Sequence, residues 1–206
     1  MFIANSASVA QLVEHLICNE AVRGSIPRAG SEMKRFYITG ISGTGKSSVA
    51  EKLKEKGIHT IDLDEVEGLC RWVNKHTKNI SHWHPGIGGE FFESHEYICD
   101  KEKLVALMNE SKDKDIVVVV GLADNQSEFL GLFDKIFLFY CDEEIFLKRI
   151  KNRTNHDFGK HDSEKEMILG WYRDYEKEML GKGALPVNTA EPLDKVVDKI
   201  LEQVCP

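Results

Sequence analysis

The fold expected of this chain follows from the stretch Gly40-Ile41-Ser42-Gly43-Thr44-Gly45-Lys46-Ser47. It matches the pattern G-x-x-x-x-G-K-S/T at every fixed position, and each residue type has a physical role. The glycines let the backbone curl so that successive N–H groups point at phosphate oxygens. Lys46 supplies a positive charge for the outer phosphates, and the hydroxyl of Ser47 can ligate Mg²⁺. The stretch therefore predicts a binding site for a nucleoside triphosphate.

The residues on either side have the secondary structure that such a loop requires. Residues 35–39 before it are short and β-prone, as in a buried strand. Residues 48–56 after it have a helical pattern with one apolar face, and Gly57 would end that helix. Because the first N–H groups of a helix also attract an anion, the loop and the helix start should bind phosphate together. The residues expected there are Gly40, Ser42, Gly43, Thr44, Gly45, Lys46, Ser47 and Ser48.

Composition sets the broad class of protein. The chain has 206 residues, of which 42% are hydrophobic and 30% charged, enough for one domain with a real core. Its net charge of −7 argues against a nucleic-acid or anionic-membrane partner, and no apolar run is long enough to span a bilayer. The five cysteines are scattered and lack C-x-x-C spacing, which predicts reduced thiols in a cytoplasmic protein.

Residues 1–32 do not resemble the rest of the chain. Read back into codons, residues 9–15 can be GTA GCT CAG TTG GTA GAG CAT, similar to a tRNA D-arm. Residues 22–28 can contain GGT TCG ATT CC, similar to a tRNA T-arm. We therefore hypothesise that residues 1–32 are a tRNA gene read in frame, that Met33 is the natural start, and that residues 33–206 form one domain. A targeting peptide or an amphipathic helix is the alternative, although the basic and apolar regions of a signal peptide are missing.

From Met33 on, strand and helix patterns alternate. Strands are expected over residues 35–39, 58–62, 116–120, 136–140 and 184–187. Helices are expected over residues 48–56, 65–74 and 101–111 (capped by Asp100), after Asp142, from a capping box Ser163-x-x-Glu166, and from Pro192 as first helical residue. Residues 76–96 lack a clean period and should be rich in loops.

This order predicts an α/β protein with a doubly wound, parallel, five-stranded sheet and helices on both of its faces. Ligands of such a sheet bind at the carboxyl ends of the strands. Asp62 and Asp64 lie at that end of the second expected strand and, being two apart on an extended chain, face the same way. Two carboxylates there can hold Mg²⁺ through water and accept the proton of an attacking hydroxyl. Alternatively, Asp64 caps the helix expected to follow.

Further candidates come from three places in the chain. Arg149 and Arg153 are four residues apart on one expected helix face, and phosphoryl transfer needs mobile positive charge of this kind. Residues 121–126 follow the most buried strand and could hydrogen-bond an acceptor or form an ordinary turn. The spacing of His82, His84 and His95 is a weak metal signal, and surface or pocket histidines are favoured. The aromatic residues of this region, which could line an acceptor pocket or pack as core, are Trp72, Trp83, Phe91, Phe92 and Tyr97.

From Met33 on, the chain resembles the small P-loop kinases of the shikimate kinase and adenylate kinase type, and more closely uncharacterised bacterial ATP-binding proteins of that group. The segments that carry the resemblance are residues 39–48, 61–64, 149–155, 158–160 and 188–194. The resemblance implies that Asp62 assists magnesium and that Asp64 binds the acceptor hydroxyl. It also implies that Arg149 packs on the adenine, that Arg153 reaches the phosphates from a short lid, and that Thr189 and Ala190 border the base.

Two departures from the family pattern concern the acceptor. Shikimate kinases have Gly-Gly-Gly after the central strand, where this chain has Gly121-Leu122-Ala123, which argues against shikimate. Residues 65–100 contain six acidic residues and only three basic ones, Arg71, Lys75 and Lys78. Nucleotide monophosphate kinases usually hold the acceptor phosphate with arginines, so that acceptor is disfavoured.

Together these observations predict an ATP- and Mg²⁺-dependent kinase that acts on a small-molecule acceptor. Lys46, Asp64 and Arg153 are its expected catalytic residues, and Ser47 and Asp62 are expected to place the metal. Two alternatives stay open: a nucleoside or nucleotide kinase, which would need Arg71 and Lys75 at the acceptor, and a regulatory protein that binds ATP and hydrolyses it slowly.

Overall fold

The computed structural model describes residues 33–87, 89–110, 115–152, 154 and 159–205. The hypothesis about residues 1–32 therefore lies outside the described residues. The same is true of Arg153 and of residues 155–158, which belong to the expected lid. Of the five cysteines, the four that are described are free thiols: Cys70, Cys99, Cys141 and Cys205.

The five expected strands form one parallel sheet, which confirms the predicted fold class. Its strands are β1 (Lys34–Thr39), β2 (His59–Asp62), β6 (Ile116–Val120), β7 (Lys135–Tyr140) and β8 (Leu185–Asn188), in the order β2-β6-β1-β7-β8. Strand β6 is nearly all valine, and residues 117–120 are fully buried. Such a strand suits the interior of a sheet that is covered on both faces.

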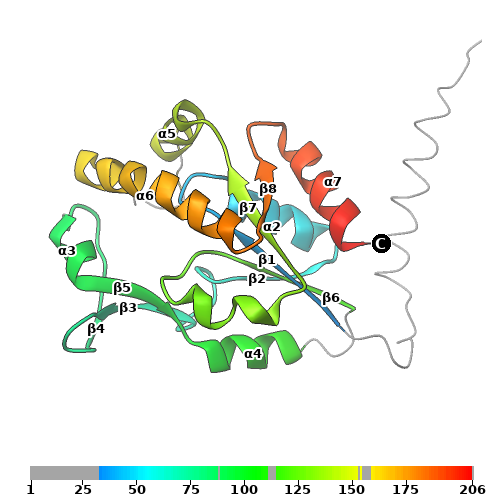
Figure 1. Cartoon of the computed structure of the whole chain (residues 1–206), viewed down its shortest axis with the longest axis horizontal. Coiled ribbons are helices and arrows are strands. Elements are labelled where there is room, and N and C mark those ends of the chain that lie inside the picture. The colour runs from blue at the N-terminus through cyan, green and yellow to red at the C-terminus, as the bar shows by residue number, and fades with distance from the viewer. Residues whose placement is uncertain (1–32, 88, 111–114, 153, 155–158, 206) are drawn as a thin grey trace, which may run out of the picture.

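Helices cover both faces of this sheet (Figure 1). On one face, α2 (Lys46–Glu55) and α7 (Leu193–Val204) pack against Phe36 and Ile38 of β1. On the other face, α4 (Lys101–Asn109) packs against Tyr37 of β1. Successive side chains of β1 therefore point into two different hydrophobic cores, one on each face of the sheet, as expected for a strand. A third cluster joins α5 (Glu143–Asn152) to α6 (Asp162–Gly181) beside the phosphate loop.

The region between β2 and α4 differs from the sequence-based expectation. The prediction of a helix over residues 65–74 is wrong. These residues form a turn followed by strand β3 (Cys70–Asn74). Residues 76–96 are also more regular than expected. A three-stranded antiparallel sheet of order β4-β3-β5 includes β3, β4 (Ile80–Ser81) and β5 (His95–Cys99), with α3 (Gly89–Ser94) before β5. These residues form a strand and not a helix because β3 pairs with a strand more than twenty residues away in the chain.

Helix ends agree with the expectations in part. Asp100 caps α4 as predicted, since its side chain accepts a hydrogen bond from the Lys103 backbone N–H at 3.0 Å. The prediction that Ser163 caps α6 is wrong. Helix α6 begins at Asp162 with His161 at the N-cap, so Ser163 is already inside the helix. Pro192 is the N-cap of α7 and not its first helical residue. None of the helices within the described residues has the length and hydropathy needed to cross a membrane.

Candidate active site

The phosphate loop between β1 and α2 has the curled backbone that its glycines predict. Gly40, Gly43 and Gly45 have φ values of 148°, 91° and 94°. A Cβ on Gly40 would lie 2.5 Å from the carbonyl oxygen of Phe139, and one on Gly43 would lie 2.9 Å from Cγ1 of Ile150. Both positions therefore need glycine for space as well as for backbone conformation.

The start of α2 faces this loop. Gly45 is the N-cap and has no side chain to bond the first N–H groups of the helix, which include those of Ser47 and Ser48. Such N–H groups, together with the helix dipole, attract an anion. Thr44 is fully buried and donates its hydroxyl to the Ile41 carbonyl oxygen at 2.8 Å, which keeps the loop closed.

Lys46 lies over the same loop. Its ammonium donates to the carbonyl oxygens of Gly40 at 2.6 Å and of Ile41 at 3.0 Å. These contacts hold the charge at the loop, within reach of an anion that the loop N–H groups would bind.

Asp62 is the last residue of β2, and in the sheet it is level with the end of β1, just before the phosphate loop. Asp62 pairs with Val120 of β6, and Val120 pairs with Ile38 of β1, two residues before Gly40. The Asp62 side chain is 2% exposed. Burial raises its pKa, while a hydrogen bond from the Asp64 backbone N–H and the charge of Lys46 lower it. A buried carboxylate near an ammonium at the mouth of a phosphate loop suits a cation-binding role.

Asp64 has a different environment from Asp62. It is exposed, and its Oδ1 accepts a hydrogen bond from the Tyr97 hydroxyl at 3.1 Å. The alternative role as a helix cap is wrong, because no helix starts among the described residues between β2 and β3. The two carboxylates are thus divided between a buried position beside the loop and an open position beside β5.

Arg149 of α5 connects the loop to the end of β8. Its guanidinium donates to Thr189 twice, to Oγ1 at 3.1 Å and to the carbonyl oxygen at 2.5 Å, and to the Thr44 carbonyl oxygen at 3.5 Å. Ala190 is exposed next to Thr189. The structure therefore brings together Arg149, Thr189 and the loop, the three parts that were expected to surround the nucleotide base and its phosphates.

Residues 121–126 are used within the protein. Asp124 accepts from the Tyr97 backbone N–H at 2.5 Å, and the Asn125 side chain exchanges two hydrogen bonds with the backbone of Cys99. Gln126 is buried and accepts from the hydroxyls of Tyr37 and Tyr175 at 3.3 and 3.0 Å. These contacts favour the turn over the acceptor-binding alternative, since the segment fastens β5 and α6 to the parallel sheet.

A buried chain of hydrogen bonds behind the loop could not be predicted from the sequence. The Tyr175 hydroxyl of α6 lies 2.5 Å from Oγ1 of Thr39, the last residue of β1, and also bonds Gln126. The Tyr37 hydroxyl bonds Gln126 and the Gly121 carbonyl oxygen. The sequence around Tyr175 does not distinguish it from the other ring-bearing positions of α6, and only its partners on β1 and after β6 do so.

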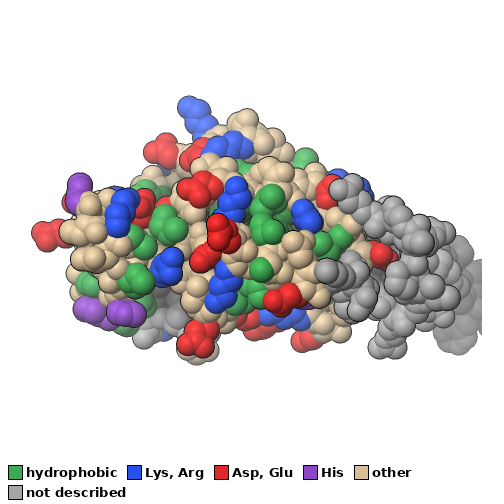
Figure 2. Space-filling view, turned by 90° about the horizontal axis from the view of Figure 1, so that it is seen from below, with side chains coloured by type: hydrophobic (Ala, Val, Ile, Leu, Met, Phe, Trp, Pro, Cys, Tyr) green, Lys and Arg blue, Asp and Glu red, His purple; other side chains and the backbone are tan. Residues whose placement is uncertain are grey.

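His82 and His84 are exposed, whereas His95 packs within the antiparallel sheet. Within the described residues, no three metal-binding side chains lie close enough to hold an ion. His95 stacks on Phe91 and bonds the Phe91 carbonyl oxygen and Ser81. Figure 2 shows histidines at the end of the molecule that carries this sheet, while acidic and basic side chains are interspersed elsewhere on that face.

The sheet order and the phosphate loop define an α/β P-loop nucleotide-binding domain. The chain belongs to the AAA domain family, whose sequence profile matches residues 37–170. No protein of curated function matches the chain.

Three solved structures are similar to this chain, and the first of them has a TM-score above 0.5. TT1252 from Thermus thermophilus has a TM-score of 0.52 and 17% identity, over 85% of this chain and 100% of that one. A shikimate kinase from Bacteroides thetaiotaomicron has a TM-score of 0.48 and 16% identity, over 84% of this chain and 98% of that one. A gluconokinase from Sinorhizobium meliloti 1021 has a TM-score of 0.47 and 19% identity, over 82% and 90%. At these identities the similarity concerns the fold alone.

Proposed function

We propose that this protein is an ATP- and Mg²⁺-dependent kinase that transfers a phosphoryl group to the hydroxyl of a small molecule. One observation carries the proposal. Of the two carboxylates that follow β2, Asp62 is buried next to the charge of Lys46, and Asp64 is exposed and oriented by Tyr97. The first position suits a metal and the second suits an acceptor, so one segment can serve both at the edge of the phosphate loop.

The residues present fit the nucleotide and the metal. The Gly40 and Gly43 backbone leaves no room for a Cβ, and α2 begins without a side-chain cap, which is the construction of a phosphate cradle. The Asp62 carboxylate and the Ser47 hydroxyl are hard oxygen donors of the type that Mg²⁺ prefers. When bound, MgATP would supply the phosphoryl group, and the metal would offset negative charge on the phosphates.

The side chains would divide the remaining work as follows. Lys46 and the loop N–H groups would bind and orient the phosphates, in place of the carbonyl contacts that Lys46 makes in this structure. Asp64 would hold the acceptor hydroxyl and take its proton as the new O–P bond forms and the bond from the transferred phosphorus to the leaving ADP oxygen breaks. Arg149 would position the nucleotide from the side of Thr189. Arg153, which lies outside the described residues, remains the proposed cation at the transferred group.

The test measures ADP release from MgATP with a library of small-molecule acceptors. We expect Lys46→Ala to abolish turnover in a folded protein, because the phosphates lose their point charge. We expect Asp64→Asn to reduce acceptor-dependent turnover at least a hundredfold and to keep ATP affinity within about twofold. Glu65→Gln is the matched control, since Glu65 is an exposed neighbour paired with Lys54 at the surface.

The outcomes separate the proposal from its alternatives. A folded protein with no measurable affinity for ATP, ADP, GTP or GDP in the presence of Mg²⁺ would contradict the proposal entirely. Bound ATP with slow hydrolysis that no acceptor stimulates would favour the regulatory protein. Turnover that depends on Arg71 and Lys75 would favour the nucleotide kinase.

A further inference from the structure

The antiparallel sheet has two faces with different chemistry. The Asp100 N–H bonds the Leu69 carbonyl oxygen, and the Lys75 N–H bonds the Ser94 carbonyl oxygen, which fixes the register of β3 against β5. In this register Trp72 lies opposite Tyr97, and Arg71 lies opposite Ile98. Because successive side chains of a strand point to opposite faces, Trp72 and Tyr97 share one face, and Arg71 is on the other.

The face with Trp72 and Tyr97 is the one that meets the proposed acceptor carboxylate. The Tyr97 hydroxyl bonds Asp64, and the rings of Tyr97 and Trp72 are 5.1 Å apart. Phe92 of α3 lies 5.4 Å from the Trp72 ring, and Trp171 of α6 lies 6.3 Å from Phe92. We call these four rings the aromatic wall: Trp72, Phe92, Tyr97 and Trp171.

The aromatic wall is partly open to solvent. Trp171 is 48% exposed, which is unusual for a tryptophan that packs against another ring. Trp72 is half-buried, and its indole N–H has no hydrogen-bond partner within the described part of the chain. The wall therefore offers ring surface and a hydrogen-bond donor next to Asp64, the features that orient a ring-bearing ligand in a binding site.

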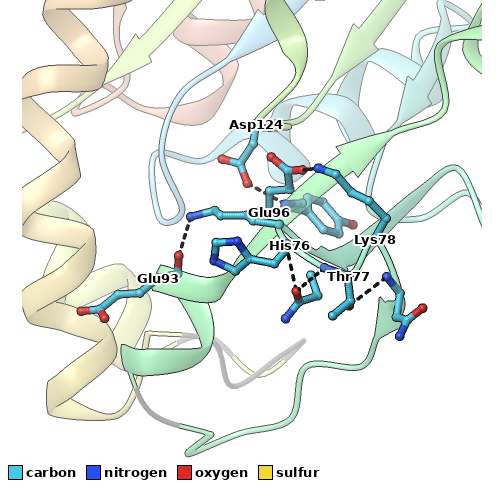
Figure 3. Close-up of polar contacts among 10 residues, drawn as sticks. His76, Thr77, Lys78, Glu93, Glu96 and Asp124 are labelled. Carbon is cyan, nitrogen blue, oxygen red and sulfur yellow. Dashed lines mark hydrogen bonds and ion pairs between the residues drawn. The ribbon is translucent and has the colours of Figure 1, made fainter.

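The cations near this sheet lie in different places, and only one of them is close to the carboxylates beside the wall. Lys75 donates to the carbonyl oxygens of Phe92 at 3.3 Å and Glu93 at 2.8 Å, and its charge lowers the pKa of Asp124 against the effect of burial. Lys78 pairs with Glu96 at 3.2 Å, as Figure 3 shows. Glu96 lies opposite Val73, on the face that carries Arg71.

Negative charge, in contrast, lies beside the aromatic wall. Asp64 bonds the Tyr97 hydroxyl, and Asp124 bonds the Tyr97 backbone N–H. The ammonium of Lys75 offsets one of these two charges, so an acceptor with a phosphate or a carboxylate at the wall would still meet a net negative charge from these three side chains. Recognition of such anions ordinarily uses arginine forks, and the arginine of β3 points to the opposite face.

We infer that the phosphoryl acceptor is an alcohol that carries a ring and has neither a phosphate nor a carboxylate group. Its ring packs against Trp72 and Tyr97, and its hydroxyl reaches Asp64. This inference rests on the proposed kinase function, and it names the substrate class of the same site.

The test uses acceptor pairs that keep the same hydroxyls and differ in one anionic group. Shikimate methyl ester is compared with shikimate, and benzyl alcohol is compared with 4-(hydroxymethyl)benzoate, with glycerol as the alcohol without a ring. Acceptor-dependent ADP release is measured with saturating MgATP. We expect kcat/KM to be at least tenfold higher for the uncharged member of any pair that reacts, and glycerol to be inactive.

Two substitutions on adjacent residues of β3 test which face is used. Trp72→Leu should raise the KM of the acceptor at least tenfold and leave the Kd of ATP unchanged. Arg71→Gln, the matched control on the opposite face, should change neither value by more than about twofold. Circular dichroism and thermal unfolding establish that both variants are folded.

The results distinguish the inference from the proposed function. A higher kcat/KM for the charged members, or an acceptor KM that depends on Arg71 and not on Trp72, overturns the inference and leaves the kinase intact. ATP binding without turnover of any uncharged ring alcohol also overturns the inference. A folded protein that binds no nucleotide overturns the proposed function first, and the inference with it.

Discussion

The Tyr97 hydroxyl donates a hydrogen bond to Oδ1 of Asp64 across 3.1 Å, and this contact joins the antiparallel sheet to the edge of the parallel one. Burial, followed by the charge of Asp64, raises the pKa of Tyr97 well above its usual range. The phenol therefore stays protonated and remains a donor throughout the physiological pH range. Its effect is to fix the carboxylate in one orientation beside Trp72.

Replacing Tyr97 by phenylalanine tests the importance of that orientation. The ring stays in the aromatic wall, but Asp64 loses its only side-chain donor within the described residues. We expect acceptor-dependent kcat to fall about tenfold, equivalent to about 1.4 kcal/mol, and the Kd of ATP to stay unchanged. Steady-state kinetics and calorimetry measure the two effects. An unaltered kcat would show that Asp64 needs no help from β5.

Arg149 offers a test of the nucleotide side of the site. Arg149→Lys keeps the charge but removes the planar fork that bonds Thr189 and the Thr44 carbonyl oxygen. We expect the Kd of ATP to rise about tenfold, which corresponds to about 1.4 kcal/mol. Affinity for inorganic tripolyphosphate should change far less if Arg149 acts at the base. Lys148→Ala, an exposed neighbour on α5, is the control. Equal losses for ATP and tripolyphosphate would place Arg149 at the phosphates instead.

Gly40 tests the space inside the phosphate loop. Gly40→Ala would put a Cβ 2.5 Å from the Phe139 carbonyl oxygen, so the loop or β7 must move. We expect a loss of about 3 kcal/mol in the free energy of unfolding, together with loss of ATP binding. Gly183→Ala is the matched control, because Gly183 also has a positive φ of 86° but has no atom within 4 Å of the added Cβ. Its loss should be about 1 kcal/mol, from backbone strain alone. Equal losses would mean that the contact with Phe139 is unimportant.

The buried hydrogen-bond chain of Tyr175, Gln126 and Thr39 should make the free energy of unfolding fall at alkaline pH. Burial raises the pKa of Tyr175 to about 12, above the value of about 10 expected in the unfolded chain. The folded state therefore holds the proton more tightly, and its stability should fall as pH rises from about 10 to about 12. Tyr175→Phe should lose about 1–2 kcal/mol at pH 7, because Gln126 and Thr39 each lose a partner, but should decline less steeply above pH 10.

Urea unfolding at a series of pH values measures this difference. Tyr140→Phe is the matched control, since the Tyr140 hydroxyl takes no part in this chain of hydrogen bonds. A parallel decline of the wild type and Tyr175→Phe would contradict the role assigned to Tyr175.

Much of the parallel sheet could be predicted because local patterns and tertiary structure agree there. The valines of β6 are apolar on both faces, as a central strand needs, and the glycines of residues 40–47 permit the positive φ angles of the loop. Asp100 could be predicted as a cap because its partner, the Lys103 N–H, is three residues away. Signals of this kind are local, so the chain carries them in consecutive residues.

The antiparallel insertion could not be predicted in the same way. The run Cys70-Arg71-Trp72-Val73-Asn74 has no strict alternation of apolar and polar residues, so the sequence carries no clear strand signal there. Its partner β5 is separated by the turn, β4 and α3. Strand preference is decided by such distant pairing more than by the residues of the strand itself.

The sequence by itself determined the phosphate loop, the five parallel strands and the position of Asp62 and Asp64 at their carboxyl edge, because each is marked by a pattern of a few consecutive residues. Only the tertiary structure decided which residues meet there. The pairing of β3 with β5 put Trp72 and Tyr97 on the side of Asp64 and turned Arg71 away, and a shift of that register by one residue would have reversed the two faces.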